Sequence, residues 1–181
     1  MQDGEILFED YPGAGGVDAA WELASGTKSF TGILAAAAQA DGLLDIDAPC
    51  AAVLPEWTND SRREITIRHL LSLTSGLVEV GGIGRPPTYA GAVEAKVENA
   101  PGAHFQYGPT PFQIFGEILH RKLEQAGERS DPAEWLQARV LDRIGVKYTD
   151  WKRGRDGNPF LPQGGQFTAR NWATFGRWVL D

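Results

Sequence analysis

The sequence predicts an α/β (α+β) domain in which one short N-terminal strand is followed by a mostly helical region. An apolar run within residues 5–8 precedes a proline and a glycine-rich turn, which is typical of a strand that ends in a turn. Further along the chain, capping residues repeatedly precede apolar residues at helical spacing. With 42% apolar residues, a chain of 181 residues can bury a sizeable core. We therefore expect a single domain over residues 1–181.

The first predicted helix covers residues 25–40. Consecutive alanines at 35–38 favour it, because alanine has the highest helix propensity. No charged residue lies between Lys28 and Asp41, which indicates a helix buried on most sides. Asp41 and Gly42 then end this helix.

Later helices carry their own start signals. Thr66 precedes a helix that stops by residues 75–76. At the next start, Thr110 is a capping residue, Pro111 suits the first helical position, and Gln113 can reach back to the cap. One face of that helix is apolar: Phe112, Phe115, Leu119 and Leu123.

Asp131 and Pro132 repeat this capping arrangement, and Thr168 opens a last helix. The apolar residues after the Asp131 cap are Leu136, Val140, Leu141 and Ile144. We expect long loops at 78–100 and 146–167. No partner for the N-terminal strand is visible downstream, and a single strand is not stable alone. We therefore expect a chain truncated at its C-terminus, with the closing strands absent.

Charge and cysteine content exclude several classes of protein. Seventeen basic residues against 24 acidic ones give a net charge of −7, which repels the phosphate backbone of a nucleic acid. The basic run at 152–155 is interpreted as a solvated loop. A lone Cys50 excludes an internal disulfide and favours a small buried residue. The spacing of the three histidines matches no zinc motif. The glycine-rich turn at 13–16 does not complete a dinucleotide-binding pattern, because Asp18 occupies the position of its last glycine.

The sequence leaves the cellular compartment open. The uncharged stretch at 29–40 is too short for a membrane span, which takes about 20 residues. The acidic N-terminus lacks the basic-then-apolar order of a signal peptide. The protein is cytoplasmic as given, or periplasmic or secreted if a leader precedes this sequence.

A candidate catalytic pair stands at the start of the first helix, where Ser25 and Lys28 are three residues apart. That spacing places two side chains on one helix face, about 5–6 Å apart. A serine hydroxyl is a poor nucleophile until a base removes its proton. Burial and the positive helix N-terminus favour a neutral lysine that can act as this base, and the Ser25 N–H can donate to an oxyanion. Alone, a Ser-x-x-Lys pair is a weak signal, because short motifs recur by chance.

The surrounding sequence makes the signal more specific. Matching blocks occur in order at 25–32, 41–44, 54–57, 67–77, 101–108 and 164–176. Together they resemble the serine β-lactamase and penicillin-binding-protein superfamily, and most of all its class C-like β-lactamase-related serine hydrolases. The resemblance implies a β-lactamase/transpeptidase-like fold, represented here by its helical region and an N-terminal strand.

By this resemblance, Ser25 is the acylated nucleophile and Lys28 is its base or proton relay. Tyr107 corresponds to the family tyrosine that shuttles protons to the leaving group, and a nearby ammonium would favour its phenolate. The implied substrate is a small ester, amide or β-lactam-like molecule. No metal or organic cofactor is implied. The oligomeric state stays open.

Two departures from the family pattern bear on the substrate. Pro109 occupies the position where the family often has an asparagine that contacts the substrate, and proline has no side-chain donor or acceptor. No Lys-Thr-Gly or His-x-Gly motif follows Tyr107, so the strand that would supply a second oxyanion donor is missing. Pro109 favours an ester or another small acyl substrate over a tightly recognised β-lactam, and the missing motif leaves the site without one wall.

Two alternatives stand beside the hydrolase. The first is a non-catalytic penicillin-binding-like sensor or binding module that keeps the pocket without turnover. The second is a structural helical protein whose motif matches are accidental, which the ordered blocks disfavour. His69 is interpreted as a packing or hydrogen-bonding residue, the loop at 81–87 as a border of the pocket or a plain loop, and the tryptophans as helix-packing residues.

Overall fold

The computed structural model of the chain describes residues 4–82 and 84–180. Residues 1–3, Ile83 and Asp181 lie outside the described residues; they include the acidic N-terminus, one position of the predicted loop at 81–87 and the chain end. The described α-helices are α1 (Lys28–Ala40), α2 (Ile67–Leu71), α3 (Tyr89–Val93), α4 (Thr110–Gln125), α5 (Pro132–Arg139) and α6 (Ala169–Leu180). The strands are β1 (Ala20–Glu22), β2 (Asp150–Trp151) and β3 (Gly165–Thr168).

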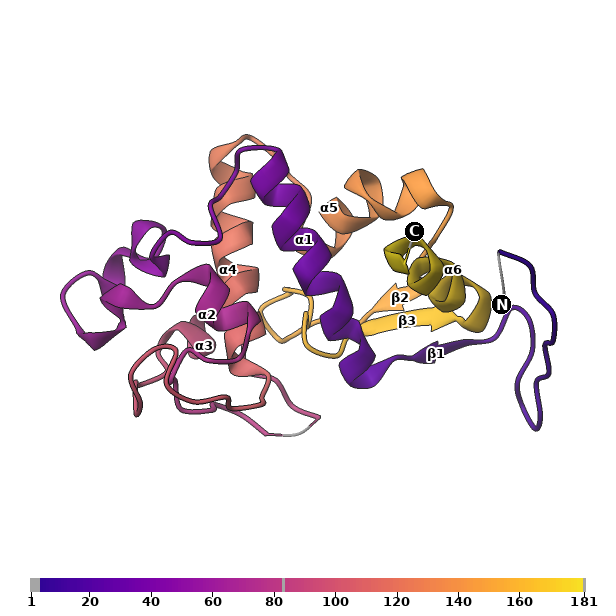
Figure 1. Cartoon of the computed structure of the whole chain (residues 1–181), viewed down its shortest axis with the longest axis horizontal. Helices are drawn as coiled ribbons and strands as arrows, with labels where there is room; N and C mark the ends of the chain where they lie inside the picture. The colour runs from indigo at the N-terminus through magenta and orange to yellow at the C-terminus, as the bar shows by residue number, and fades with distance from the viewer. Residues whose placement is uncertain (1–3, 83, 181) are drawn as a thin grey trace.

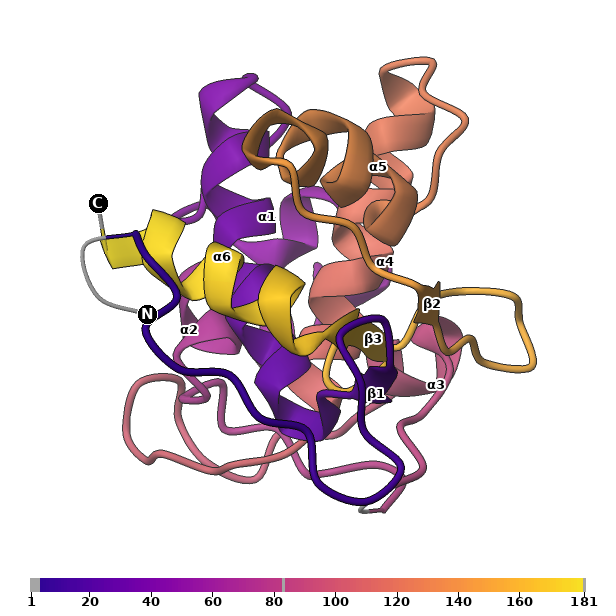
Figure 2. The ribbon, with the colours of Figure 1, turned by 90° about the vertical axis from the view of Figure 1, so that its right-hand side faces the viewer.

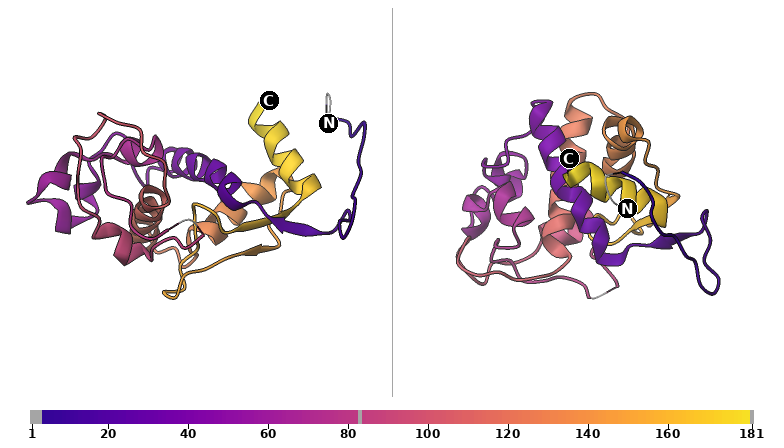
Figure 3. Two further views of the ribbon diagram at one scale, coloured as in Figure 1. Left: turned by 90° about the horizontal axis from the view of Figure 1, so that it is seen from below. Right: turned by 45° about the vertical axis from the view of Figure 1, so that its right-hand side comes forward.

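A helical part and a small sheet lie at opposite ends of the molecule (Figure 1). Helices α1 and α4 contact each other in the middle, and α2 and α3 pack against α4 on the side away from the sheet. Helix α6 continues directly from β3 and passes in front of α1 in the view of Figure 2. The N-terminal segment extends from the sheet end as an arm (Figure 3). Mixed helix and strand content agrees with the predicted α+β class.

The sheet corrects two expectations. Its order is β1-β3-β2 with antiparallel pairing, and Trp21 lies opposite Phe167 while Trp151 lies opposite Gly165. The expected strand within 5–8 is wrong: residues 6–8 form no strand, and their apolar side chains are exposed. Partner strands do occur downstream: β2 lies inside the region expected to be a loop at 146–167, and β3 begins within its last residues and ends at Thr168. They are too short for an alternating pattern to reveal them.

The first helix begins as expected, with a 3₁₀ turn at Ala24–Thr27 leading directly into α1. Its burial was overestimated. Phe30 and Leu34 are fully buried, whereas Ser29 and Gly32 on the other side are exposed. Uncharged small residues tolerate either environment, so the absence of charge did not mark the buried face.

The helix caps agree with expectation in two places and disagree in one. The Thr66 hydroxyl accepts the His69 N–H, and His69 Nδ1 accepts the Thr66 N–H, both at 3.2 Å, so His69 has the hydrogen-bonding role expected of it. The Asp131 carboxylate likewise caps α5 in a reciprocal box. Thr110 is instead the first residue of α4, after Pro109, and Gln113 does not reach back to the cap. The apolar face predicted for α4 is buried: Phe112, Phe115, Leu119 and Leu123.

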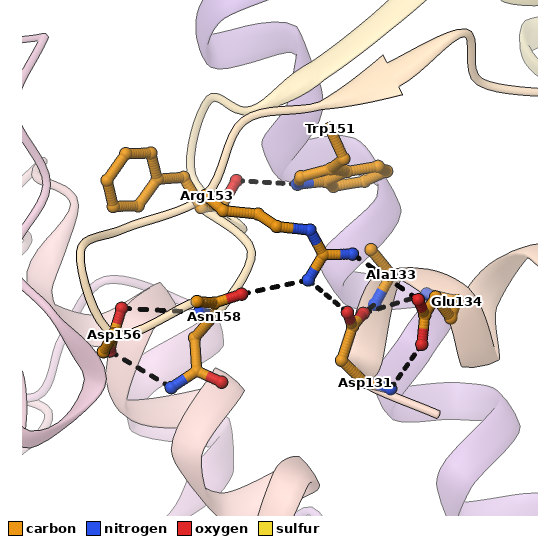
Figure 4. A network of polar contacts seen from close by, with 9 residues as sticks. Asp131, Ala133, Glu134, Trp151, Arg153, Asp156 and Asn158 are labelled. Carbon is orange, nitrogen blue, oxygen red and sulfur yellow. Dashed lines mark hydrogen bonds and ion pairs between the residues drawn. The ribbon is translucent and has the colours of Figure 1, made fainter. Parts of the chain in front are cut away.

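The region from 140 to 160 contains more regular structure and more side-chain contacts than expected. Helix α5 ends at Arg139, and a 3₁₀ helix follows at Leu141–Ile144. The basic run at 152–155 is not simply solvated, because Lys152 and Arg153 form ion pairs with acidic side chains. Figure 4 shows Arg153 reaching from this segment to the Asp131 and Glu134 carboxylates at the start of α5.

Aromatic side chains join the sheet to the helices. The Phe30 ring of α1 stacks on Phe167 of β3 with centroids 4.8 Å apart, and it lies 4.2 Å from the Phe175 ring of α6. Trp151 and Trp172 complete this cluster, which confirms a packing role for these two tryptophans. Cys50 is fully buried, as expected, and burial raises the pKa of its thiol to about 12. Within residues 4–82 and 84–180, no helix has the length and apolar character needed to span a membrane.

Candidate active site

Ser25 and Lys28 lie at the junction between the 3₁₀ turn and α1. The turn brings the Lys28 Nζ to 3.1 Å from the Ser25 Oγ, so the two side chains hydrogen-bond directly. Ala24, immediately before the serine, has φ +45°, a left-handed conformation that is unfavourable for a residue with a Cβ. Strained backbone of this kind persists where surrounding structure enforces it, and it concentrates at functional sites.

Lys28 is held by more than the serine. Its Nζ also donates to the Pro162 carbonyl at 3.0 Å. The same nitrogen lies 4.9 Å from the centre of the Tyr107 ring and 5.6 Å from that of Phe112, within the range of cation–π attraction. One cationic group therefore links segments that are far apart in the sequence.

The Pro162 carbonyl belongs to the loop that leads into β3. The fully buried Thr27 hydroxyl accepts the Gly165 N–H at 3.2 Å, and the Gly165 carbonyl accepts the Leu23 N–H at 3.0 Å. Gly164 has no room for a side chain, since a Cβ there would lie 2.7 Å from the Trp151 ring. These contacts fix the loop against the turn that carries Ser25.

Tyr107 comes from a second loop, immediately before α4. The backbone N–H of Gln106 donates to the Leu73 carbonyl at 2.8 Å, and Leu73 is itself in the left-handed region with φ +59°. On the other side, the Glu79 carboxylate accepts the Thr110 N–H at 3.0 Å. A Cβ on Gly108 would lie 1.9 Å from that carboxyl carbon, so glycine is required there for the observed packing.

The environment of Tyr107 favours its phenolate. Hydrogen bonding to Ser25, and then to Lys28 together with the Lys28 charge, lowers the pKa of Tyr107 below its usual value, although burial opposes the shift. The ring is nevertheless 56% exposed, and Ser25 is exposed as well. The site is open to solvent on this side.

The structure thus brings together the three residues singled out from the sequence, Ser25, Lys28 and Tyr107. Sequence reasoning missed the groups that hold them: the Pro162 carbonyl, the Thr27 hydroxyl and the Glu79 carboxylate. A backbone carbonyl leaves no trace in a sequence, and Glu79 resembles any other charged loop residue. No cluster of three or more His, Cys, Asp or Glu side chains suited to a metal ion occurs among the described residues.

The comparison that decides the family is a match over residues 1–174 to the family model described as beta-lactamase. The chain belongs to the β-lactamase family. It therefore falls in the serine β-lactamase and penicillin-binding-protein superfamily of serine hydrolases, as the sequence blocks implied.

Individual relatives are distant. The chain is 24% identical over 156 residues to protein flp of Staphylococcus aureus, covering 80% of this chain and 31% of flp. It is 27% identical over 135 residues to a β-lactamase of Pseudomonas fluorescens, covering 71% of this chain and 36% of that protein. The chain thus spans about a third of the length of these relatives.

Solved structures show the fold. A protein from Bacteroides dorei DSM 17855 superimposes with a TM-score of 0.80 at 22% identity, covering 98% of this chain and 55% of the other. A class C β-lactamase gives a TM-score of 0.68 at 19% identity, covering 88% and 50%. The predicted β-lactamase/transpeptidase-like fold is confirmed, and this chain represents about half of it.

Proposed function

We propose that this chain carries the nucleophile, base and proton shuttle of a serine hydrolase that works through an acyl-enzyme. Ser25 is the nucleophile, Lys28 the base and Tyr107 the shuttle. The observation that supports this most strongly is the Lys28 Nζ, which lies 3.1 Å from the Ser25 Oγ and 4.9 Å from the centre of the Tyr107 ring. We also propose that residues 1–181 form a single domain.

In the proposed reaction, the Ser25 Oγ attacks the carbonyl carbon of the substrate and a new C–O bond forms. The hydroxyl proton passes by one of two routes: to the Tyr107 phenolate when Lys28 is an ammonium, or to the Lys28 Nζ when that amine is neutral. The bond to the leaving group then breaks, and the leaving group takes that proton. In the second half a water molecule gives one proton to Lys28 or Tyr107 and its oxygen bonds to the acyl carbon. The bond between the acyl carbon and Oγ then breaks, the proton taken from the water passes to the Ser25 Oγ, and the acid product leaves.

The proposed substrate is a small ester in preference to a β-lactam. Pro109 lies two residues after Tyr107 and offers no side-chain hydrogen bond to a substrate amide. An ester also has the better leaving group, so it depends less on protonation as the bond breaks. Small-molecule binding needs no metal or organic cofactor in this scheme.

The test is labelling of the chain with a fluorophosphonate, followed by peptide mapping. The Ser25 Oγ would displace fluoride from phosphorus, so we expect a covalent adduct on Ser25 and none in Ser25→Ala. Ser29→Ala is the matched control, because Ser29 is exposed one turn further along α1. A wild-type chain that folds but carries no adduct at Ser25 would reject the assignment.

A non-catalytic binding module is the second candidate, favoured by Pro109 and by the open site. Its signature would be one equivalent of bound acyl group that is not released. A chromogenic ester separates the two, because acylation of Ser25 releases the coloured alcohol. Release of many equivalents of the alcohol indicates a hydrolase, whereas a burst of one equivalent followed by a plateau indicates a binding module.

A further inference from the structure

The buried amide of Gln113 makes two hydrogen bonds to loop backbone that the helix-start pattern does not predict. Gln113 is only 1% exposed, in the first turn of α4. Its Nε2 donates to the Pro87 carbonyl at 2.7 Å, and its Oε1 accepts the Leu161 N–H at 3.1 Å. Both ends of the amide are therefore engaged by backbone groups of two different loops, as a buried polar group requires.

One of these loops carries the acceptor for the candidate base. Leu161 is followed directly by Pro162, whose carbonyl accepts from Lys28 Nζ at 3.0 Å. The Leu161 side chain is also buried, so the residue is fixed at both its side chain and its N–H. The far part of this loop is held separately, by Arg153 and by Asp156, which accepts from Asn158 (Figure 4).

The other end of the connection leads to Tyr107. Helix α4 begins at Thr110, a few residues after Tyr107, and it also carries Phe112, whose ring lies beside Lys28. Gln113 thus joins the helix that follows the phenol to the loop that holds the amine. A shift of about 1 Å between reacting groups costs roughly 10²-fold in rate, so a rigid connection between them matters.

We propose that Gln113 is a positioning residue: its amide fixes the Pro162 carbonyl relative to α4 and so holds Lys28 between Ser25 and Tyr107. The proposal rests on the proposed function. It assigns no contact with substrate to Gln113, which acts only through the loop backbone. The proposal can also be tested without the reaction. The pKa of Tyr107 is lowered first by its hydrogen bond to Ser25 and then by Lys28, so a displaced Lys28 should lower it less.

The test compares Gln113→Leu with Gln137→Leu. Gln137 is a matched control because its amide also bridges two backbone groups, donating to the Val146 carbonyl and accepting the Tyr148 N–H, at a place remote from Lys28. Both variants lose a two-way amide bridge and we expect both to melt at lower temperature. Only Gln113→Leu should slow Ser25 labelling by fluorophosphonate, by roughly 10²-fold.

A second measurement tests the role of Gln113 without any reaction at Ser25. Alkaline titration of tyrosine absorbance should show the Tyr107 pKa moving up toward its usual value in Gln113→Leu and staying in place in Gln137→Leu. If Gln113→Leu does not fold, Gln113→Met serves instead, because it keeps a side chain of similar length and loses both the acceptor for the Leu161 N–H and the donor to the Pro87 carbonyl.

The outcomes separate the two proposals. A wild-type chain without a Ser25 adduct rejects the proposed function, and the titration alone then decides the role of Gln113. Wild-type labelling rates and an unshifted Tyr107 titration in the folded Gln113 variant would overturn the positioning role. Equal slowing of labelling in Gln113→Leu and Gln137→Leu would also overturn it, because a general loss of stability would then explain both.

Discussion

The two sides of the candidate site are built in different ways. On one side, Ser25 and Lys28 belong to one continuous turn and helix, and the buried Thr27 between them fastens that turn to β3. On the other side, Tyr107 sits 56% exposed on a loop and depends on distant residues such as Glu79 and Leu73 for its position. The geometry of the first, local side is set by residues close in the sequence, whereas that of the second, tertiary side is set by tertiary contacts. Substitutions on the two sides should therefore affect labelling and stability in different proportions.

The largest effect should come from Lys28→Ala on the local side. This variant removes the group that hydrogen-bonds the Ser25 hydroxyl, and general-base catalysis typically contributes about 10²–10⁴-fold. We expect fluorophosphonate labelling of Ser25 to slow by a factor in that range. Lys152→Ala is the control, since Lys152 pairs with Glu22 at the sheet and lies outside the site. Labelling of Lys28→Ala at the wild-type rate would remove lysine from the mechanism.

The tertiary side should break at Gly108. In Gly108→Ala the new Cβ would lie 1.9 Å from the carboxyl carbon of Glu79, so that carboxyl group must move. Because the Glu79 carboxylate accepts the Thr110 N–H, this hydrogen bond would be lost. We expect unfolding free energy to fall by about 1–2 kcal/mol and labelling to slow as Tyr107 shifts. Chemical denaturation and labelling rates measure the two effects.

A control and a double variant sharpen this result. Gly32→Ala, on an exposed face of α1 with nothing within 4 Å of the new Cβ, should be neutral or stabilising by up to about 1 kcal/mol. In a Glu79→Ala background the clash is absent, so Gly108→Ala should cost little more. A cost that stays the same in both backgrounds would show that Glu79 is not the cause.

The same contrast explains how far the sequence could predict this molecule. The Ser25–Lys28 contact follows from a spacing of three residues on a helix, which any reader of the chain can apply. The capping box at Asp131 is local in the same sense and was predicted correctly. Tyr107 could be placed only through the resemblance to a family, because nothing in its neighbourhood specifies which residue it will face.

The failures share a physical cause. A two-residue strand such as β2 has no period, and its partner β3 exists only because the rest of the chain brings the two together. Gln113 fits a helix-start pattern, yet its amide hydrogen-bonds two backbone groups of buried loops. These bonds stabilise the fold more than a cap would, because the Thr110 N–H at the start of α4 is already bonded to Glu79. Apolar residues 6–8 form a strand only if a partner is present, and the described chain offers them none.

The smallest and most direct test of the contrast is the order in which the tyrosines ionise. Tyr107 is the one whose pKa is lowered, by Ser25 and Lys28, whereas burial raises the pKa of Tyr89 and Tyr148, and the Glu9 carboxylate raises that of Tyr11. As pH rises, Tyr107 should therefore lose its proton first, in a step that precedes the other three.

Ultraviolet titration of the folded chain should show this early step, and Tyr107→Phe should remove it while leaving the later steps in place. Lys28→Ala should move the step to higher pH, since the ammonium then no longer favours the phenolate. Tyr148→Phe should leave it unchanged. If the early step survives in Tyr107→Phe, another tyrosine is responsible, and the phenol does not face the lysine in solution as it does in the structure.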